Sequence, residues 1–393
     1  MRPGLLLWPA AALILGTALV AGQSRPRARD IGIAPGAGTP GPANGITDVA
    51  AVAVGHRTIV RADTVRTGVT VILPHGGNLF REKVPGAVFV GNAFGKLAGS
   101  TQVDELGTIE SPIVLTNTLS VGAALDAVVR WTIAQPGNEN VRSVNGLVGE
   151  TNDGTLNDIR GFHVTRDDVL AAIAAARTSP AEEGAVGAGT GTIAFGWKGG
   201  IGTSSRVVGT DPTRWTVGVL VQSNYGGRLV IDGVPVWREL RPGRGAGGAP
   251  VLPFTSSPVP RFTSFPISPD GSCMIVVATD APLDARDLKR LAARAIFALA
   301  RTGSSYSNGS GDFAIAFSTH WSLRVTGEAS PQPRTILPTD AVSGLFEAAL
   351  EATEEAVYNS LLKATDTTSG GRTIRALPVE ELREVMKKYG RKE

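Results

Sequence analysis

The stretch PDGSCMIVVATD, residues 269–280, places a turn directly before an apolar strand. Pro-Asp-Gly is typical of a turn, and the run from Cys273 to Thr279 is almost wholly apolar, as in a central strand covered on both faces. Two interpretations of Ser272 stay open: an ordinary residue after a turn, or a new N-terminus made by cutting the chain after Gly271. The dipeptide alone does not decide, because Gly-Ser also occurs at 99–100, 303–304 and 309–310.

The rest of the chain predicts a mixture of strands and helices. Strand-like runs follow Val49 and recur as WTVGVLVQSNYG and GDFAIAFST. Helices are predicted from Ser120, over TRDDVLAAIAAAR (165–177) with a capping box of Thr165 and Asp168, after Asp284, and at about 340–363 and 378–388. Because strands and helices do not strictly alternate, the pattern indicates an α/β fold of layered sheets flanked by helices.

Composition excludes several classes of function. The 393 residues carry 38 Lys+Arg against 35 Asp+Glu, without a basic run interleaved with aromatic residues, so nucleic-acid binding is disfavoured. The single cysteine, Cys273, leaves no internal disulfide and no cysteine metal cluster. The four histidines are scattered, so neither a metal site nor a Ser-His-Asp triad is indicated.

Two segments outside the regular elements have a recognisable character. Arg2 precedes an apolar run from Leu5 to Val20, followed by small residues, which predicts a signal peptide over residues 1–22 rather than an uncleaved membrane anchor. Residues 23–48 read as an irregular leader segment. Residues 236–271 form a long aperiodic stretch with several prolines and glycines, and a loop of this length is usually functional or disordered.

The glycine-rich stretch at residues 184–206, GAVGAGTGTIAFGWKGGIGTSSR, suggests a phosphate-binding loop at first sight. A Walker A loop needs Gly-Lys followed by Ser or Thr, and here Trp197 separates Gly196 from Lys198. No clean strand precedes a dinucleotide-binding fingerprint either. We therefore interpret the glycines as turns between strands.

Four motifs together resolve the question raised by Ser272. DGSCMIVVATDAPL, TGSSYSNGSGDFAIAFST, GETNDGTLNDIRG and VQSNYG occur in one chain. This set resembles the DmpA-like peptidases, the L-aminopeptidase/D-esterases and β-peptidyl aminopeptidases, from about Gly45 to the C-terminal TIRALPVEELREVM. In that family a precursor cuts itself at Gly-Ser and the freed serine is the catalytic nucleophile.

The resemblance implies a role for each matching residue. Cleavage would fall between Gly271 and Ser272, and the α-amino group of Ser272 would be its base, since no triad histidine is at hand. Ser310 and Asp312 match the serine and the acidic residue that orient the nucleophile, and Asn224 matches an asparagine of the oxyanion hole. Glu150 matches the acid that binds the free amino group of the substrate. From the residues alone, each of these four has an ordinary alternative: turn residues, a strand-end cap and a surface charge.

The resemblance also implies an αββα sandwich of two sheets flanked by helices, formed by an α chain of residues 23–271 and a β chain of residues 272–393. The expected enzyme is a periplasmic or secreted serine aminopeptidase that needs no metal or cofactor. Its substrates would be small peptides or aminoacyl amides and esters, including β-peptides. It would have no nucleic-acid partner and no membrane partner after signal removal, and would form a homo-oligomer of processed αβ units.

Two other classes of protein stay open. An acyltransferase like the ornithine acetyltransferases also cuts itself but uses threonine, so Ser272 and the signal sequence argue against it. An inactive envelope binding protein on the same fold would keep an intact chain. Cys273 lies next to the nucleophile but should point to the opposite face of the strand, which predicts packing rather than chemistry.

Overall fold

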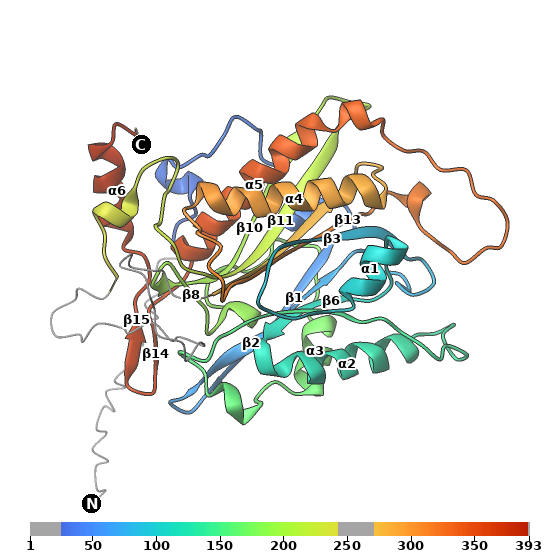
Figure 1. Cartoon of the computed structure of the whole chain (residues 1–393), viewed down its shortest axis with the longest axis horizontal. Coiled ribbons are helices and arrows are strands. Elements are labelled where there is room, and N and C mark those ends of the chain that lie inside the picture. Colours follow the sequence, from blue (N-terminus) through green and yellow to red (C-terminus); the bar gives the residue numbers. More distant parts are fainter. Residues whose placement is uncertain (1–24, 243–270, 392–393) are drawn as a thin grey trace, which may run out of the picture.

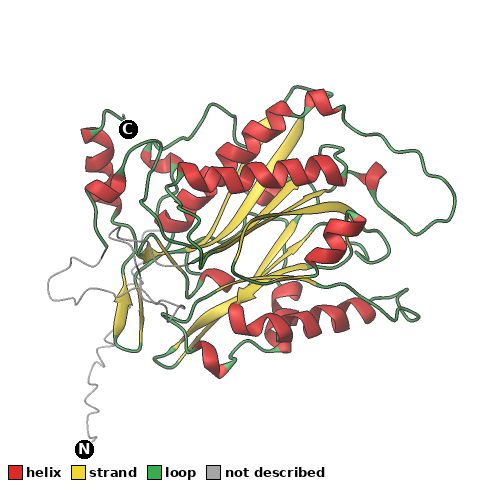
Figure 2. Ribbon diagram, in the orientation of Figure 1, coloured by secondary structure: helices red, strands yellow, loops and turns green. Residues whose placement is uncertain are grey.

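The structure, a computed structural model of the chain, describes residues 25–242 and 271–391. The predicted signal peptide (1–22) and most of the aperiodic segment before Ser272 lie outside these ranges. Two sheets face each other, and helices cover the outer face of each (Figures 1 and 2). This arrangement confirms the predicted αββα sandwich.

The six-stranded sheet carries the strand that begins at Ser272, at its centre. Its order is β10-β11-β12-β13-β3-β5, with β12 antiparallel to β11 and parallel to β13. The strands are β10 (Gly200–Val208), β11 (Trp215–Asn224), β12 (Ser272–Thr279), β13 (Gly311–Ser318), β3 (Val84–Ala93) and β5 (Thr108–Ile109).

The five-stranded sheet faces it with the order β1-β2-β6-β7-β4. Its strands are β1 (Ala53–Arg61), β2 (Val65–Leu73), β6 (Ile113–Asn117), β7 (Leu147–Thr151) and β4 (Leu97–Ala98). Two small hairpins stand beside the sheets: β8 (Ile193–Ala194) with β9 (Trp197–Lys198), and β14 (Thr367–Ser369) with β15 (Arg372–Ile374).

The helices of the described residues are α1 (Ser100–Leu106), α2 (Val121–Ile133), α3 (Arg166–Ala174), α4 (Ala285–Arg301), α5 (Ser343–Leu362) and α6 (Val379–Lys388). α4 and α5 pack on the six-stranded sheet, whereas α2 and α3 pack on the five-stranded sheet (Figure 1). The helices predicted at about 340–363 and 378–388 are confirmed.

Alternation along β12 divides its side chains between two apolar layers. Cys273 and Ile275 belong to the core shared with α4 and α5, whereas Met274 and Val276 fill the space between the sheets. Cys273 is fully buried, and burial raises the pKa of its thiol well above the usual value, which keeps it neutral. This supports the predicted packing role. Ser272 falls on the side that faces the second sheet, by the same alternation.

Helix caps follow the sequence signals, with one correction. The Asp284 side chain accepts the backbone N–H of Asp287, and Thr165 and Asp168 form the predicted capping box. However, α3 ends at Ala174, short of the predicted end at Arg177. Arg177 instead exchanges backbone hydrogen bonds with Val54 of β1, so the chain leaves the helix to extend the sheet.

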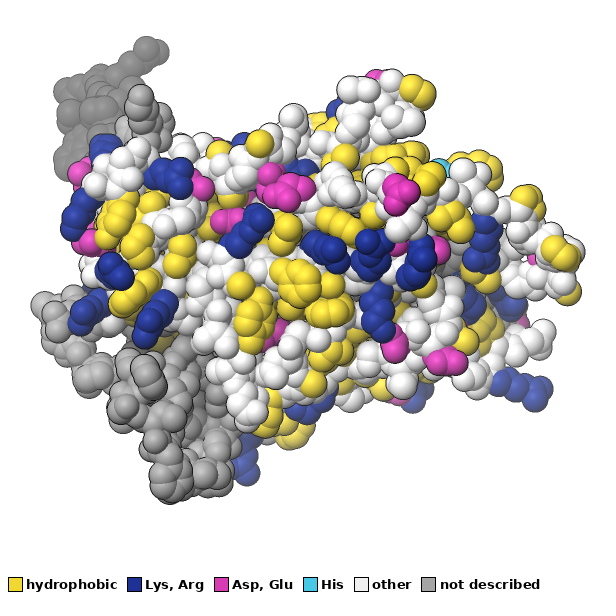
Figure 3. Space-filling model, turned by 45° about the horizontal axis from the view of Figure 1, so that its top comes forward, with side chains coloured by type: hydrophobic (Ala, Val, Ile, Leu, Met, Phe, Trp, Pro, Cys, Tyr) yellow, Lys and Arg dark blue, Asp and Glu magenta, His cyan; other side chains and the backbone are white. Residues whose placement is uncertain are grey.

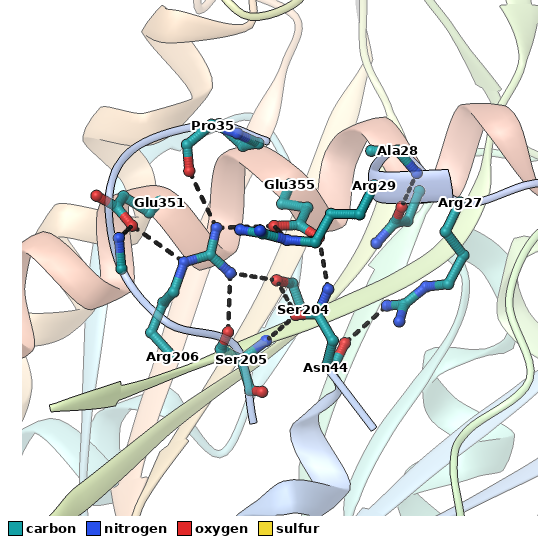
Figure 4. Close-up of polar contacts among 12 residues, drawn as sticks. Arg27, Ala28, Arg29, Pro35, Asn44, Ser204, Ser205, Arg206, Glu351 and Glu355 are labelled. Carbon is teal, nitrogen blue, oxygen red and sulfur yellow. Dashed lines mark hydrogen bonds and ion pairs between the residues drawn. The ribbon is translucent and has the colours of Figure 1, made fainter. Parts of the chain in front are cut away.

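The leader interpretation of residues 23–48 was incomplete, because part of this segment is anchored in a buried ion network (Figure 4). We call Arg206, Glu351, Glu355, Arg29 and Asn44 the Arg206 cluster. The Arg206 side chain is fully buried and lies 3.0 Å from Glu351 and 2.7 Å from Glu355, both on α5. Arg29 of the leader segment pairs with Glu355 at 3.0 Å. The start of the described chain is therefore fixed to a helix near its end.

The face of the molecule that carries α4 mixes charged and apolar side chains. On the helical face brought forward in Figure 3, Lys and Arg side chains are interspersed with acidic and hydrophobic ones. Several α4 arginines have local partners: Arg290 lies 2.8 Å from Asp287, and Arg301 lies 3.5 Å from Glu354. None of the helices among the described residues has the length and apolar character needed to cross a membrane.

Candidate active site

The candidate site is centred on the peptide bond between Gly271 and Ser272, where β12 begins. The Ser272 hydroxyl donates a hydrogen bond to the Gly271 carbonyl oxygen at 2.7 Å. The same oxygen accepts the backbone N–H of Gly311, on β13, at 3.1 Å. The hydroxyl thus lies against the neighbouring carbonyl, and that carbonyl is already polarised by a second donor.

The backbone around Gly271 leaves no room for a side chain. A Cβ built on Gly271 would lie 2.3 Å from the Asn224 carbonyl oxygen and 2.4 Å from the Tyr225 Cα, both backbone atoms. Glycine is therefore the residue that lets β11 approach the junction this closely. The sequence alone showed the Gly-Ser pair but not this crowding.

Ser310 and Asp312 lie beside the junction, on the parallel neighbour of β12. In that pairing Ser272 lies opposite Gly311, and Cys273 lies opposite Asp312. Ser310 Oγ donates to Asp312 Oδ1 at 2.9 Å, while Asp312 Oδ2 has no hydrogen-bond partner among the described residues. Burial raises the pKa of Asp312 to about 6, against the hydrogen bonds from Ser310 and the Cys273 backbone. The ordinary reading of Asp312 as a turn residue is wrong, because it lies within a buried strand.

Asn224 is the last residue of β11 and pairs with Ser272 across the sheet. Its side-chain oxygen accepts the Ile193 backbone N–H at 2.9 Å, and its Nδ2 donates to the Asn152 carbonyl at 3.0 Å. An amide nitrogen carries two hydrogens, so one remains for another acceptor. A neutral donor held beside Ser272 suits an oxyanion site.

Glu150 lies in β7 of the facing sheet and is 2% exposed, so its reading as a surface charge is wrong. Its carboxylate accepts the Lys96 backbone N–H at 3.0 Å and a hydrogen bond from the Thr118 hydroxyl. The Lys96 ammonium lies 3.7 Å away and is half exposed. A primary ammonium group can therefore approach this carboxylate from the solvent side.

The chain between β3 and β4 brings the two sheets together at the site. A Cβ built on Gly95 would lie 3.3 Å from Glu150 Oε1 and 3.3 Å from the Gly311 Cα. Glu150 is thus one residue's width from the strand beside Ser272. The predicted site residues gather around the start of β12: Gly271 and Ser272 at the peptide bond, Ser310 and Asp312 on or next to β13, Asn224 on β11, and Glu150 on β7 of the facing sheet. Asp312 shares the helix-covered face of the sheet with Cys273, its partner in the register, whereas Ser272 is on the face toward the second sheet.

Sequence reasoning missed the residues that hold these side chains in place. Gly311, Asn152 and Ile193 act through backbone groups, which no residue type signals, and Thr118 is one threonine among many. Among the described residues, no group of three His, Cys, Asp or Glu side chains is arranged to hold a metal ion.

Two facing sheets between helical layers, with a serine at the first position of a central strand, define the fold of the N-terminal-nucleophile hydrolases. A solved structure from Ochrobactrum anthropi, described as an L-aminopeptidase D-Ala-esterase/amidase and a variant of this fold, has a TM-score of 0.82 and 36% identity. The match covers 93% of this chain and 99% of that one. A Burkholderia sp. β-aminopeptidase structure has a TM-score of 0.80 and 38% identity, over 93% of this chain and all of the other.

The chain belongs to peptidase family S58, whose model matches residues 44–374. A relative from Sphingosinicella microcystinivorans, named β-peptidyl aminopeptidase BapA, is 43% identical over 97% of both chains. The resemblance seen in the sequence is confirmed, and the protein is a serine aminopeptidase that acts on peptide substrates.

Proposed function

We propose that the chain cuts itself between Gly271 and Ser272 and then removes β-amino acids from the N-termini of peptides. The observation that carries the proposed self-cleavage is the hydrogen bond of 2.7 Å from the Ser272 hydroxyl to the Gly271 carbonyl oxygen. The Gly311 backbone N–H donates a second hydrogen bond to the same oxygen.

Self-cleavage begins with attack of Ser272 Oγ on the Gly271 carbonyl carbon. A C–O bond forms, and the negative charge on the oxygen is stabilised by the Gly311 backbone N–H. The C–N bond then breaks as the nitrogen takes up the proton that the Ser272 hydroxyl lost on attack, which leaves Gly271 as an ester on Ser272 Oγ. Water hydrolyses this ester, giving a carboxylate on Gly271 and a free α-amino group on Ser272.

In turnover the free α-amino group is the base that accepts the proton of its own hydroxyl. Its ordinary pKa of about 7.7 to 8.0 leaves an appreciable unprotonated fraction near neutrality. The Asp312 carboxylate and the Ser310 hydroxyl, which are hydrogen-bonded to each other, orient this amino group, and Asp312 Oδ2, without a partner among the described residues, is its acceptor. Asn224 donates its remaining N–H to the oxyanion of the substrate.

Glu150 binds the ammonium group of the substrate and so limits the reaction to the N-terminal residue. Support comes from Lys96, whose ammonium group already lies 3.7 Å from this carboxylate and shows that a cation is accommodated there. Since the Lys96 side chain is half exposed, a substrate ammonium can displace it at small cost.

The preference for β-amino acids rests on the relatives. A chain named β-peptidyl aminopeptidase is 43% identical over nearly the full length, and the Burkholderia structure is titled a β-aminopeptidase. The α-aminoacyl alternative is supported by the Ochrobactrum structure at 36% identity. β-Alanyl p-nitroanilide against L-alanyl p-nitroanilide, compared by kcat/KM, decides between the two.

The proposed products are an α chain of residues 23–271, after removal of a signal peptide (1–22), and a β chain of residues 272–393. β12 and β13 of the β chain lie between β11 and β3 of the α chain, so backbone hydrogen bonds hold the products in one sheet. We propose a periplasmic or secreted location and a homo-oligomer of these pairs. Light scattering on the purified protein measures the oligomer.

The deciding experiment compares the wild-type chain with Ser272→Ala. Wild type should give two chains, with N-terminal sequencing of the smaller beginning Ser-Cys-Met-Ile-Val. Ser272→Ala should give one intact, folded and inactive chain, because the loss of one hydroxyl hardly disturbs packing. An active preparation that contains only intact chain contradicts the proposal.

A further inference from the structure

The side-chain amide of Asn224 is held by hydrogen bonds at both its oxygen and its nitrogen. Its oxygen accepts the Ile193 backbone N–H at 2.9 Å, and its nitrogen donates to the Asn152 carbonyl at 3.0 Å. Since a backbone N–H can bond only to the amide oxygen, these two contacts fix which end is which. The direction of the remaining Nδ2–H, beside Ser272, therefore depends on the positions of two loops.

The first loop is the glycine-rich stretch, and Lys198 holds it. Ile193 and Lys198 are directly paired across the β8–β9 hairpin. Lys198 is fully buried, and its ammonium donates to the Gly189 carbonyl at 2.9 Å and to the Gly199 carbonyl at 2.8 Å. The ammonium thus ties the chain before the hairpin to the chain after it, and fixes the hairpin that aims the Ile193 N–H.

The second loop contains Asn152 and continues directly into Asp153. Asp153 is 2% exposed, and its Oδ1 accepts the Asn157 side chain at 3.0 Å. The glycine-rich loop passes directly over it, because a Cβ built on Gly191 would lie 2.8 Å from the Asp153 Cβ. Burial lowers the pKa of Lys198 to about 7 and raises that of Asp153 to about 7, and the charge of Asp153 acts against the shift at Lys198.

We propose that Lys198 and Asp153 are positioning residues that lock the two loops around Asn224 and thereby aim its free N–H at the oxyanion. The proposal rests on the proposed role of Asn224 in turnover. The proposal also gives a role to the glycine-rich stretch (184–206), for which phosphate binding was disfavoured. Its glycines let the loop pass closely around the buried Lys198. Apolar side chains would fill the same space without the cost of burying two ionisable groups, so we attribute the presence of Lys198 and Asp153 to orientation.

The test measures steady-state kinetics of the processed enzyme with β-alanyl p-nitroanilide, per mole of β chain. Lys198→Met should lower kcat by about 10- to 100-fold, as expected for a misplaced catalytic group, with KM changed less than about two-fold. Glu351→Gln is the matched control: it alters a buried charge of the Arg206 cluster and should leave kcat within about two-fold. An unchanged kcat in Lys198→Met overturns the inference.

A double-mutant cycle separates this inference from the proposed function. If Lys198 acts through Asn224, then adding Lys198→Met to Asn224→Ala should lower kcat no further. If the two effects multiply, Lys198 does not act through Asn224 and the inference is wrong, while the role of Asn224 stands. If Asn224→Ala alone leaves kcat unchanged, the proposed oxyanion role fails and the inference fails with it.

Asp153→Asn keeps the test decisive if Lys198→Met does not fold. This near-isosteric change retains an oxygen for Asn157 but removes the opposite charge. The expected result is again a lower kcat at nearly constant KM, and an unchanged kcat contradicts the inference.

Discussion

Two buried polar clusters in this protein differ in how completely their side chains are hydrogen-bonded. In the Arg206 cluster, each of the five N–H donors of Arg206 has an acceptor: Glu351, Glu355, the Ser204 hydroxyl, and the Ser205 and Pro35 carbonyls (Figure 4). At the candidate active site, Asp312 is equally buried, yet within residues 25–242 and 271–391 its Oδ2 has no hydrogen-bond partner. A complete network stabilises the fold, whereas an incomplete one leaves a group ready to bind something else.

The two clusters also differ in what they connect. The Arg206 cluster ties the leader segment to α5 by contacts that are complete in the uncut chain. The active-site cluster surrounds a peptide bond that we propose to be broken, and the partner that we propose for Asp312 Oδ2, the Ser272 α-amino group, would exist only after cleavage. The comparison thus separates a network that is complete in the uncut chain from one in which, by our proposal, Asp312 gains its partner on cleavage.

The largest effect is expected on stability, from Arg206→Met in the uncut Ser272→Ala chain. Removing one partner of a buried ion pair typically costs about 3 to 5 kcal/mol, because the other charges stay buried and unpaired. Urea denaturation measures the change. Arg301→Met, which breaks ion pairs of a half-exposed arginine, is the control and should cost at most about 1 kcal/mol. Equal losses of stability in the two variants would show that the buried network of Arg206 stabilises the fold no more than half-exposed ion pairs do.

Asp312→Asn should stabilise the uncut chain at neutral pH, whereas Arg206→Met should destabilise it. Burial raises the pKa of Asp312 from 3.8 to about 6, so folding favours its protonated form, and that contribution is lost as the pH rises through about 6. The charged carboxyl therefore costs up to about 3 kcal/mol at neutral pH.

In the Ser272→Ala background, Asp312→Asn should raise the free energy of unfolding at pH 7.5, with the gain vanishing below about pH 4. In the otherwise wild-type enzyme the same change should lower kcat about 100-fold. A variant that is both less stable at pH 7.5 and fully active would show that Asp312 belongs with the satisfied cluster.

Glu150→Gln tests the part of the active-site cluster that we propose to bind the substrate. Loss of the charge should cost roughly 1.5 to 3 kcal/mol in kcat/KM for substrates with a free amino group, the range for hydrogen bonds to charged groups. Self-cleavage should be largely spared, because it involves no substrate amine. The control is an N-acetylated substrate, which wild type should hydrolyse poorly. Equal hydrolysis of blocked and free substrates by wild type would exclude Glu150 from this role.

The smallest effects are expected from the histidines, since each one has a hydrogen-bond partner that is not a site residue. Those partners are Thr70 for His56, Glu82 for His75, Asp158 for His163 and Ser322 for His320. Each His→Ala variant should keep kcat within about two-fold when kcat is expressed per folded enzyme. A variant that cuts itself normally but loses turnover would point to a histidine base and against the α-amino group.

Much of the fold was predictable because its signals are local. The apolar run after Ser272, the Asp284 cap and the Thr165–Asp168 capping box each lie within a few residues, and all three appear in the structure. The end of α3 was not predictable, because Arg177 leaves the helical register to pair with Val54, which is far away in the sequence.

By itself, the sequence indicated most of the helices and strands and, through four separated motifs, the family and a set of candidate site residues. Only the tertiary structure decided which groups serve that site, since strands distant in sequence meet there. It placed Glu150 of one sheet near Gly311 of the other, and set the Ser272 hydroxyl against a carbonyl that Gly311 binds. It also buried Lys198 beneath the loop that holds Asn224. Such contacts depend on backbone groups and on packing between remote segments, and a linear pattern of residue types carries neither.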